Sequence, residues 1–325
     1  MRTRKLLIPL VATAVVVATA AGAGASTALA APDRSAATIE VSTAAELKAA
    51  LGDASPGDTI HLADGTYTGN FKTSTAATSA APITLTGSAR AVLTAGGGYG
   101  LHLNGASHWT VKGITVTGGQ KGIMIDSAEG VVIDSVTVHD LDMEGVHFRD
   151  SSSDGVIRNS KIYDTGHDGR GMGEGVYVGT ANTLDDRSDN VQIRDNVIGP
   201  GVGGENVDIK EGTTGAVVSG NTFDGSGLTG ANFDDSWVDV KGNGVVVEDN
   251  EGTHTTNDGY QTHTQQDGWG CGTVFRGNTS DLTGASGPDQ LAIHVTNQSD
   301  DCRTTVYADN TVTGGKGLTN VDVTN

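Results

Sequence analysis

The sequence predicts an all-β protein made of stacked repeats, and the repeats indicate a right-handed parallel β-helix with an N-terminal capping helix. Three observations lead to this fold class. Short strands with apolar residues at alternate positions recur along the chain. Each is followed by a second strand, and an asparagine comes directly after many of these second strands. Glycine supplies 48 of the 325 residues and aromatic residues only 4%, which is typical of a chain with many tight turns.

Residues 1–30 have the features of a secretory signal peptide. Arg2, Arg4 and Lys5 form a positive region, which is followed by an apolar stretch and a cleavage site of small residues. We expect residues 31–325 to form a single β-helix domain that is secreted to the extracellular space. No second apolar run of about 20 residues follows, so we expect no membrane partner.

The charge balance narrows the possible partners. The chain holds 39 acidic and 20 basic residues, which argues against nucleic acid because a nucleic-acid-binding protein needs a basic face. No feature of the sequence specifies an oligomer, and a β-helix capped at one end can exist alone. We therefore expect a monomer.

The first elements of the domain predict how the stack is closed. A strand is expected at 38–41, and Thr43 and Glu46 then form a capping box, which predicts a helix that continues to Leu51. The apolar face of this helix includes Leu47. Such a helix can cover the first turn of the stack and shield its edge from other chains.

The rest of the chain is organised as repeats. Two apolar residues separated by one residue are found at 101–103, 123–125, 146–148, 176–178, 207–209, 238–240, 260–262, 291–293 and 321–323. Successive copies start 22 to 31 residues apart, and a second strand follows each copy. A repeat of 22 residues is too short for a propeller blade, and strand alternation excludes helical repeats. One turn of a parallel β-helix fits, with neighbouring turns about 4.8 Å apart.

Two further patterns are interpreted as structural. Asparagines just after the second strands predict a stacked ladder, formed by Asn196, Asn221, Asn250, Asn278 and Asn310. Cys271 and Cys302 are 31 residues apart, which is one turn of the repeat, so they should lie on adjacent turns within reach of a disulfide.

Outward-facing residues of the first strands predict a polar groove. One column contains His102, Met124, His147, Tyr177, Asp208, Asp239, Gln261 and Ala292. The next contains Asn104, Asp126, Arg149, Gly179, Lys210, Lys241, His263 and His294. Acidic residues stand just before the strands, namely Glu144, Glu174, Glu205, Asp258 and Asp289. Such a face, about six turns long, suits a polymer better than a small molecule.

Two details of this face suggest catalysis on a sugar. Lys210 stacked on Lys241 would bring like charges close together, which should lower the pKa of one lysine and make it a possible general base. Trp237 is expected to point outward beside Asp239, where it could stack on a sugar ring.

The chain resembles secreted pectin-lyase-like β-helix proteins, and most closely the chondroitinase B and alginate lyase group of polysaccharide lyases. The resemblance rests on the opening segments 41–51, 56–60, 64–67 and 81–87, and on the segment from Glu205 to Lys210 followed by 218–223. It implies that Glu205 binds calcium and that Lys210 removes the C5 proton of a uronate. The arginine of the group's next turn is replaced here by Lys241, and an acidic calcium ligand by Gly203.

These residues predict a secreted lyase that cleaves an acidic, uronate-containing polysaccharide by β-elimination. Lys210 would be the base, and Lys241 would neutralise the uronate carboxylate or act as the acid, with His263 as the next candidate. Glu205, Asp208 and Asp239 would hold Ca²⁺ through hard oxygen ligands. The substrate-binding residues are predicted to be Arg149, Tyr177, Asp208, Trp237, Asp239 and His294.

Two alternatives remain open at this point. Asp208 and Asp239 on adjacent turns could form the carboxylate pair of a glycoside hydrolase, at a separation that suits the retaining mechanism. A glycan-binding protein with no catalytic activity could use the same groove. A lyase would create an unsaturated product, a hydrolase would create only new reducing ends, and a binding protein would create neither.

Overall fold

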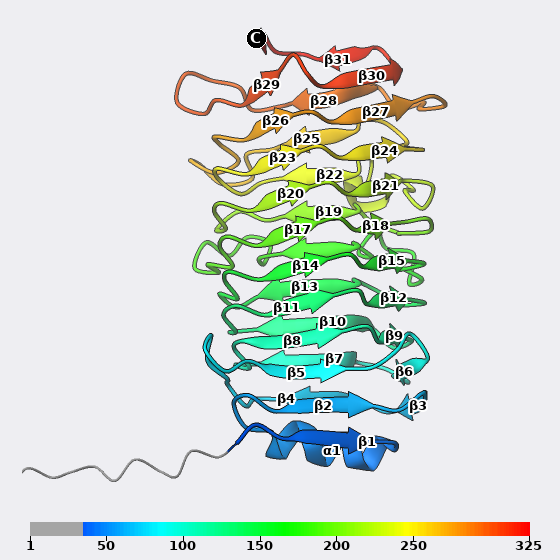
Figure 1. Cartoon of the computed structure of the whole chain (residues 1–325). Helices are drawn as coiled ribbons and strands as arrows, with labels where there is room; N and C mark the ends of the chain where they lie inside the picture. The colour runs from blue at the N-terminus through cyan, green and yellow to red at the C-terminus, as the bar shows by residue number, and fades with distance from the viewer. Residues whose placement is uncertain (1–34) are drawn as a thin grey trace, which may run out of the picture. The chain divides into compact units, whose positions relative to one another are not determined.

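The computed structural model describes residues 35–325, of which Ala36–Asn325 form one compact unit. The strands of this unit pair in parallel into three sheets that run along a single stack (Figure 1). Each complete turn of chain adds one strand to each sheet, which confirms the parallel β-helix predicted from the repeats. The predicted signal peptide, residues 1–30, lies outside the described residues.

We name each sheet by its first strand. The β1 sheet contains β1 (Thr38–Val41), β2 (Thr59–Leu62), β5 (Ile83–Thr86), β8 (Trp109–Lys112), β11 (Val132–Asp134), β14 (Val156–Arg158), β17 (Gln192–Arg194), β20 (Val217–Ser219), β23 (Val246–Glu248), β26 (Val274–Arg276), β29 (Thr305–Tyr307) and β32 (Val323–Thr324). The β3 sheet contains β3 (Gly65–Thr68), β6 (Ala91–Thr94), β9 (Thr115–Thr117), β12 (Thr137–His139), β15 (Lys161–Tyr163), β18 (Val197–Ile198), β21 (Thr222–Asp224), β24 (Glu251–Thr253), β27 (Thr279–Leu282) and β30 (Thr311–Gly314). The β4 sheet contains β4 (Phe71–Thr73), β7 (Tyr99–Asn104), β10 (Lys121–Asp126), β13 (Val146–Arg149), β16 (Val176–Val178), β19 (Val207–Ile209), β22 (Val238–Val240), β25 (Tyr260–Thr262), β28 (Leu291–Val295) and β31 (Gly317–Thr319).

The helix α1 (Ala44–Asp53) lies at the N-terminal end of the stack, as predicted (Figure 1). Its capping box is complete, because the Thr43 side chain accepts from the Glu46 N–H and the Glu46 carboxylate accepts from the Thr43 N–H. Leu47 and Leu51 are fully buried on its apolar face. Among the described residues, no helix has the length and apolar character needed to cross a membrane.

An asparagine ladder runs through the stack, as predicted. The amide of Asn221 donates to the side-chain oxygen of Asn250 over 2.9 Å, and Asn250 donates to Asn278 over the same distance. Each side chain also bonds a strand carbonyl, as Asn250 does with Val218 at 3.0 Å. A buried amide costs free energy unless it is hydrogen-bonded. Since each asparagine is bonded to the asparagine of the next turn, the ladder holds the turns that follow the β1 sheet in one register.

The predicted disulfide between Cys271 and Cys302 is present, with the two Cα atoms 4.8 Å apart. It joins the loop after β25 to the loop after β28, two turns that are neighbours in the stack. These loops extend on one flank of the β4 sheet.

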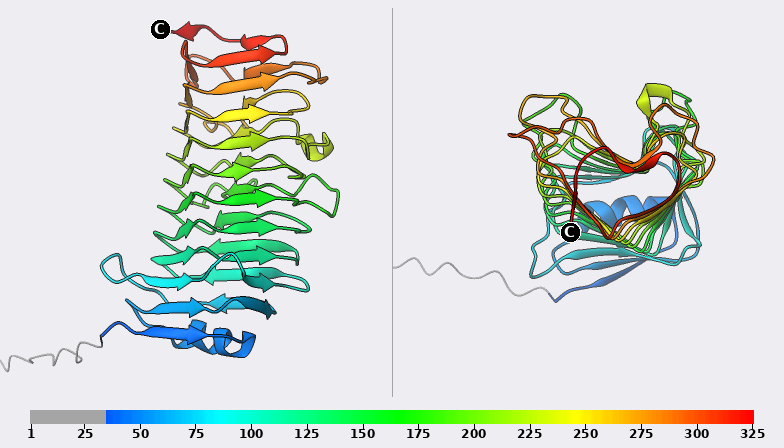
Figure 2. Two further views of the ribbon diagram at one scale, coloured as in Figure 1. Left: turned by 45° about the vertical axis from the view of Figure 1, so that its right-hand side comes forward. Right: turned by 90° about the horizontal axis from the view of Figure 1, so that it is seen from above.

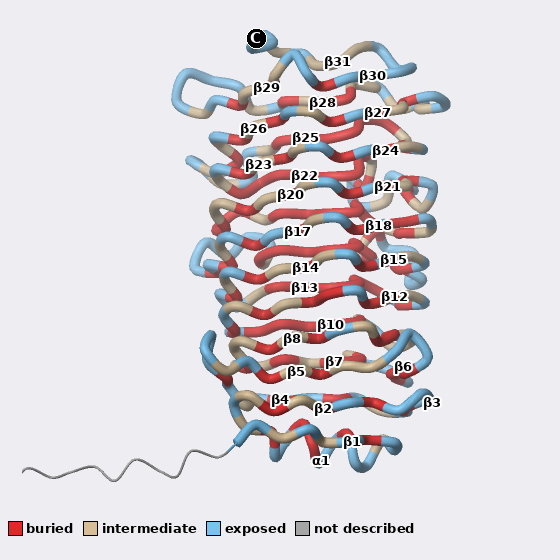
Figure 3. Tube along the Cα trace, in the orientation of Figure 1, coloured by how far each residue is buried: buried red, intermediate tan, exposed pale blue. Residues whose placement is uncertain are grey.

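The β4 sheet differs from the others in how its outward side chains are covered. In the β1 sheet the central residues Ile157 and Val218 are fully buried, while the residues on either side of them are half-buried. In β16, β19, β22 and β25, by contrast, all three residues are buried (Figure 3). Loops rise on both flanks of this face when the stack is seen from above (Figure 2). A groove lies over this sheet, and outward residues of the β4 sheet such as Asp208 and Asp239 form its floor.

The predicted register of the β4 sheet is correct as far as β25 and wrong after it. Asp208 pairs with Asp239 and Asp239 with Gln261, as expected. Gln261 then pairs with His294 rather than with Ala292. The last repeat was also misplaced, because the β4 sheet ends with β31, whereas the predicted strand at 321–323 overlaps β32 of the β1 sheet.

Candidate active site

The groove over the β4 sheet has a volume of about 640 Å³. This lies within the range of about 300–1,000 Å³ that is typical of ligand sites. Most of the predicted site residues line it, namely Tyr177, Glu205, Asp208, Lys210, Asp239, Lys241, His263 and His294. They come from consecutive turns, so the stacking of the repeats is what brings them together.

Asp208 lies at the centre of the groove floor and pairs with two lysines. Its Oδ2 contacts the ammonium of Lys210, which follows β19. Its Oδ1 accepts from Nζ of Lys241, one turn further along the stack, at 3.0 Å. The Lys241 ammonium also contacts Asp239. Because Asp208 is 1% exposed and Lys241 6%, these charges compensate one another away from bulk water.

The expectation that one stacked lysine would have a lowered pKa is wrong. Burial alone would lower the pKa of Lys210, but the neighbouring Asp208 carboxylate raises it above its usual value. The pKa of Lys241 is raised in the same way, by Asp208 and Asp239 against the effect of burial. A carboxylate placed between the two ammonium groups therefore decides their protonation, and both lysines are cationic in the free protein.

His263 is paired with Asp239 at the next turn. Its Nδ1 lies 2.8 Å from Oδ1 of Asp239, and its side chain is 31% exposed, which leaves Nε2 available to the groove. Burial opposes protonation of His263, but the Asp239 carboxylate raises the pKa of the imidazole. Asp239 itself has a lowered pKa, because Lys241 and His263 outweigh the effect of its burial.

Tyr177 lies directly beside Lys210. The Lys210 ammonium is 5.0 Å from the centre of the tyrosine ring, a cation–π distance. His147 packs edge-on against the same ring at 4.4 Å and donates from Nε2 to the Gly179 carbonyl at 2.9 Å. Burial and the nearby Asp208 carboxylate raise the pKa of the Tyr177 phenol. Tyr177 is therefore a neutral hydroxyl group at the groove floor.

Three buried carboxyl groups form a cluster next to the lysines. Glu174, Glu205 and Asp208 each offer an oxygen atom within 4.8 Å of the others. Burial and the Asp208 charge raise the pKa of Glu174 to about 8, and burial also raises the pKa of Glu205 well above its usual value. Oε2 of Glu174 is buried without a hydrogen-bond partner. This cluster differs from the predicted cation ligands, because Glu174 takes the place of Asp239.

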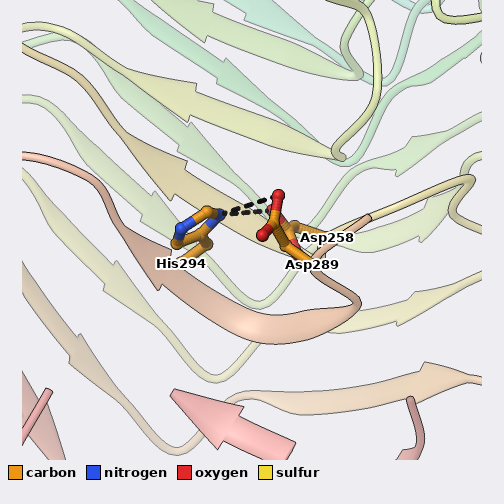
Figure 4. A group of neighbouring side chains, drawn as sticks. All are labelled: Asp258, Asp289 and His294. Carbon is orange, nitrogen blue, oxygen red and sulfur yellow. Dashed lines mark hydrogen bonds and ion pairs between the residues drawn. The ribbon is translucent and has the colours of Figure 1, made fainter. Parts of the chain in front are cut away.

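His294 lies at the C-terminal end of the groove in a second group of charged residues. Its Nδ1 is 2.8 Å from Oδ2 of the buried Asp258 and 3.9 Å from Asp289 (Figure 4). The hydrogen bond to Asp258 raises the pKa of the imidazole. Asp258 also accepts from the backbone N–H of Leu291 and the amide of Gln261. Since Asp258 is already saturated by these donors, we interpret the group as a fixed histidine facing the groove.

Trp237 does not point into the groove, which contradicts its predicted role as a sugar-stacking residue. The side chain is fully buried, with its ring 5.6 Å from that of Tyr260 and its indole N–H donating to the Thr253 carbonyl at 2.9 Å. Gly252 and Gly259 leave the space that the indole ring fills, because a Cβ at either position would overlap it. Trp237 is part of the core of the stack.

Arg149 belongs to the predicted column but lies outside the residues that line the groove. Its guanidinium donates to the buried Asp126 from Nε at 2.8 Å, and His102 contacts the other oxygen of Asp126 at 2.8 Å. Asp126 has a lowered pKa because these two partners outweigh its burial. The structure therefore holds Arg149 in an ion pair nearer the N-terminal end of the sheet.

Sequence reasoning did not identify Phe233. This residue belongs to η1 (Ala231–Phe233), in the loop between β21 and β22, and it lines the groove with 87% of its surface exposed. The signal in the sequence is weak, because the loop at 225–237 contains two aromatic residues, Phe233 and Trp237, and nothing in the sequence shows which of them is exposed.

The fold and the site define a parallel β-helix protein with lysines, carboxylates and a tyrosine gathered in one groove over a single sheet. The family model described as "right handed beta helix region" matches residues 99–184. The structure of an alginate lyase from Paenibacillus sp. str. FPU-7 is 40% identical, covers 88% of this chain and 99% of its own, and has a TM-score of 0.82. The chain therefore belongs to this family of right-handed parallel β-helix polysaccharide lyases, and it is a polysaccharide lyase.

Two more distant structures share the fold. Pectate lyase Pel9A is 14% identical, with 85% of this chain and 78% of its own covered and a TM-score of 0.62. A mannuronic acid specific family 6 polysaccharide lyase from human gut microbiota is 16% identical, with 87% and 67% covered and a TM-score of 0.59. A comparison with curated proteins gave no match.

Proposed function

We propose that this lyase cleaves a uronate-containing polysaccharide by β-elimination and that it acts outside the cell. The observation that carries the proposal is that Lys210 and Lys241 share the buried Asp208 carboxylate, with the Tyr177 ring beside Lys210, in a groove lined by several consecutive turns. Alginate is the first substrate to test, because the relative that is 40% identical is an alginate lyase. The disulfide and the predicted signal peptide support secretion, since disulfides persist in oxidising compartments.

β-Elimination first needs a positive charge near the uronate carboxylate, because neutralisation of this group makes the C5 proton more acidic. Lys241 is suited to this role, since its ammonium is held in place by Asp208 and Asp239 and has a raised pKa. The same contacts make Lys241 unsuited to donate a proton, because its loss would leave two buried carboxylates without their shared cation.

Lys210 is the proposed base and takes the C5 proton on Nζ. Its side chain is 12% exposed, compared with 7% for Lys241, so it reaches the groove more readily. Deprotonation of Lys210 leaves Asp208 still paired with Lys241 at 3.0 Å, which limits the electrostatic cost of forming the neutral amine. Because the pKa of Lys210 is raised in the free protein, its ammonium must lose one proton to solvent before the neutral amine can take the C5 proton.

Tyr177 is the proposed acid. As the C5 proton is removed, the electrons of the C5–H bond form the C4–C5 double bond, the C4–O4 bond breaks, and the phenol protonates the leaving oxygen. The Lys210 ammonium, 5.0 Å from the tyrosine ring, can then return a proton to the phenolate. His263 is the second candidate for the acid, because its Nε2 faces the groove while Nδ1 is bonded to Asp239.

The residues of the acidic cluster fit a calcium ion. Glu174, Glu205 and Asp208 provide hard oxygen ligands, and the unpartnered Oε2 of Glu174 is a buried acceptor without a donor. These three residues, rather than Asp239, would hold the ion. A bound calcium would add positive charge beside the uronate carboxylate.

The hydrolase alternative has less support. Asp208 and Asp239 are both paired with Lys241, and the pKa of Asp239 is lowered. A glycoside hydrolase needs one of its two carboxyl groups to be protonated as the acid. The lowered pKa of Asp239 does not suit that role, and Asp208 is held between the ammonium groups of Lys210 and Lys241.

The test is to incubate the protein with alginate, pectate, glucuronan and glycosaminoglycans, and to follow the ultraviolet absorbance of the unsaturated product. We expect at least one polymer to be cleaved and Lys210→Ala to lose about 10²- to 10⁴-fold in kcat. The matched control is Lys161→Ala, an exposed lysine on the β3 sheet. New reducing ends without the absorbance, or full activity in Lys210→Ala, would overturn the proposed reaction.

A further inference from the structure

Phe233 is exposed in a way that the fold does not require. Its surface is 87% exposed, about twice the value of each other large hydrophobic residue that is exposed among those described, namely Leu184 at 42%, Val197 at 43% and Val323 at 41%. An isolated exposed apolar residue is ordinary on a protein surface. Phe233, however, lies on the wall of the groove that contains Lys210 and Tyr177.

The loop that carries Phe233 is held in an unusual conformation. Asn232 and Phe233 have φ values of 51° and 67°, in the left-handed region that bulky residues rarely adopt. The carboxylate of Asp234 accepts from the backbone and the hydroxyl of Thr229, both at 3.1 Å. The surrounding contacts thus hold Phe233 in a backbone conformation that phenylalanine alone would not favour. Residues held in this way are often found at ligand sites.

The loop that contains Gly171 packs against the loop that carries Phe233. The amide of Asn232 donates to the Gly171 carbonyl at 3.2 Å. Gly171 has a φ of 67°, and a Cβ at this position would overlap the carbonyl oxygen of Ala231. The two loops therefore touch closely, and Phe233 is displayed on a supported wall rather than on a free loop.

We infer that Phe233 is the platform on which one sugar ring of the bound polysaccharide stacks. This inference rests on the proposed function and adds an apolar subsite to it. A pyranose ring presents a face of C–H groups that an aromatic ring can cover, while its carboxylate and hydroxyl groups face polar side chains. Most residues that line the groove are charged or polar, and the ring of Tyr177 is buried under its neighbours, so Phe233 supplies the exposed aromatic surface that Trp237, buried in the core, does not.

The inference predicts an effect on binding rather than on the chemical step. Phe233 has no group that can move a proton, and stacking acts equally on the bound substrate and on the transition state. Its loss should therefore raise KM and leave kcat nearly unchanged.

The experiment measures binding of alginate oligosaccharides by calorimetry in the Lys210→Ala background, where no cleavage interferes. We expect Phe233→Ala to weaken binding about 10-fold, by the loss of one buried aromatic contact. Phe233→Trp should retain the affinity, and the control Leu184→Ala should not change it. In the active background, Phe233→Ala should raise KM by a similar factor.

Each outcome has a defined meaning. If the native protein cleaves alginate and Phe233→Ala binds oligosaccharides as tightly as its parent, the stacking platform is refuted while the proposed function stands. If kcat falls and KM does not change, Phe233 acts on the chemical step and the inference is also refuted. If the native protein neither binds nor cleaves alginate or the other uronate polymers, the proposed function fails and the inference fails with it.

Discussion

The ammonium of Lys241 reaches back across one turn of the stack to the carboxylate of Asp208, 3.0 Å away. Parallel pairing makes this contact possible, because Asp208 and Asp239 are direct partners in the β4 sheet and Lys241 follows Asp239 by two residues. The same contact keeps Asp208 paired with a cation when Lys210 is neutral, which is why Lys210 rather than Lys241 is the proposed base.

Lys241→Met should destabilise the protein strongly. The substitution leaves the buried Asp239 without its ammonium partner and Asp208 with one lysine instead of two. We expect a loss of about 3–5 kcal/mol in the free energy of unfolding, measured by chemical denaturation. Adding Asp239→Asn should recover part of this loss, because it removes the buried carboxylate that has lost its lysine and keeps only His263 as a partner. If Lys241→Met alone were as stable as the native protein, the ion pairs of Lys241 with Asp208 and Asp239 would not be important for stability.

Tyr177→Phe should impair catalysis and leave binding intact. The ring and its contact with Lys210 are kept, and only the phenolic hydroxyl, which is the proposed acid, is lost. We expect kcat to fall about 10²- to 10⁴-fold with KM within a few-fold of the native value. Tyr163→Phe, on β15 outside the groove, is the control. Unchanged kcat in Tyr177→Phe would direct attention to His263 as the acid.

Calcium should raise the midpoint of thermal unfolding if Glu174, Glu205 and Asp208 bind it. At a concentration about 100 times the dissociation constant, a single site adds about 2.7 kcal/mol to the free energy of unfolding. Glu174→Gln should abolish most of this stabilisation, and Glu251→Gln, an exposed residue of β24, should preserve it. An identical calcium response in both variants would exclude the acidic cluster as the site.

His147 should make the protein sensitive to acid. Burial, with the Lys121 charge second, lowers the pKa of His147 to about 3, whereas the unfolded chain takes up a proton on this residue near its ordinary value of 6.5. Between these values the unfolded state binds more protons, so stability falls as the pH decreases, by up to about 1.4 kcal/mol per pH unit. His147→Gln should flatten the decrease in denaturation experiments from pH 7 to pH 4. An equally steep decrease in the variant would assign acid sensitivity to other groups.

Much of the fold and part of the site could be predicted, because a β-helix repeats one local pattern. Apolar alternation located the strands, and their spacing placed Asp208 over Asp239 correctly. The pattern failed at β28 because Leu291, Ile293 and Val295 are all apolar. A shift of two residues keeps the same side chains facing inward, so alternation cannot distinguish the two registers.

Features that depend on distant contacts could not be read from the sequence. The outward direction assigned to Trp237 extended the alternation of β22 one residue too far, while the indole ring instead fills the space left by Gly252 and Gly259. The raised pKa of Lys210 arises from the direction of the Asp208 side chain, which spacing does not reveal. The role of Glu174 in the cluster likewise depends on where its carboxyl group points.

The asparagine ladder and the parallel pairing make each turn depend mainly on the turns directly before and after it. The groove floor is consequently modular along the axis of the stack. Duplication or removal of one whole turn at β28, where His294 lines the groove, would lengthen or shorten the track for the polymer without moving Lys210 relative to Tyr177. The length of sugar chain that the groove binds can thus change in evolution without a change in the residues that cleave the chain.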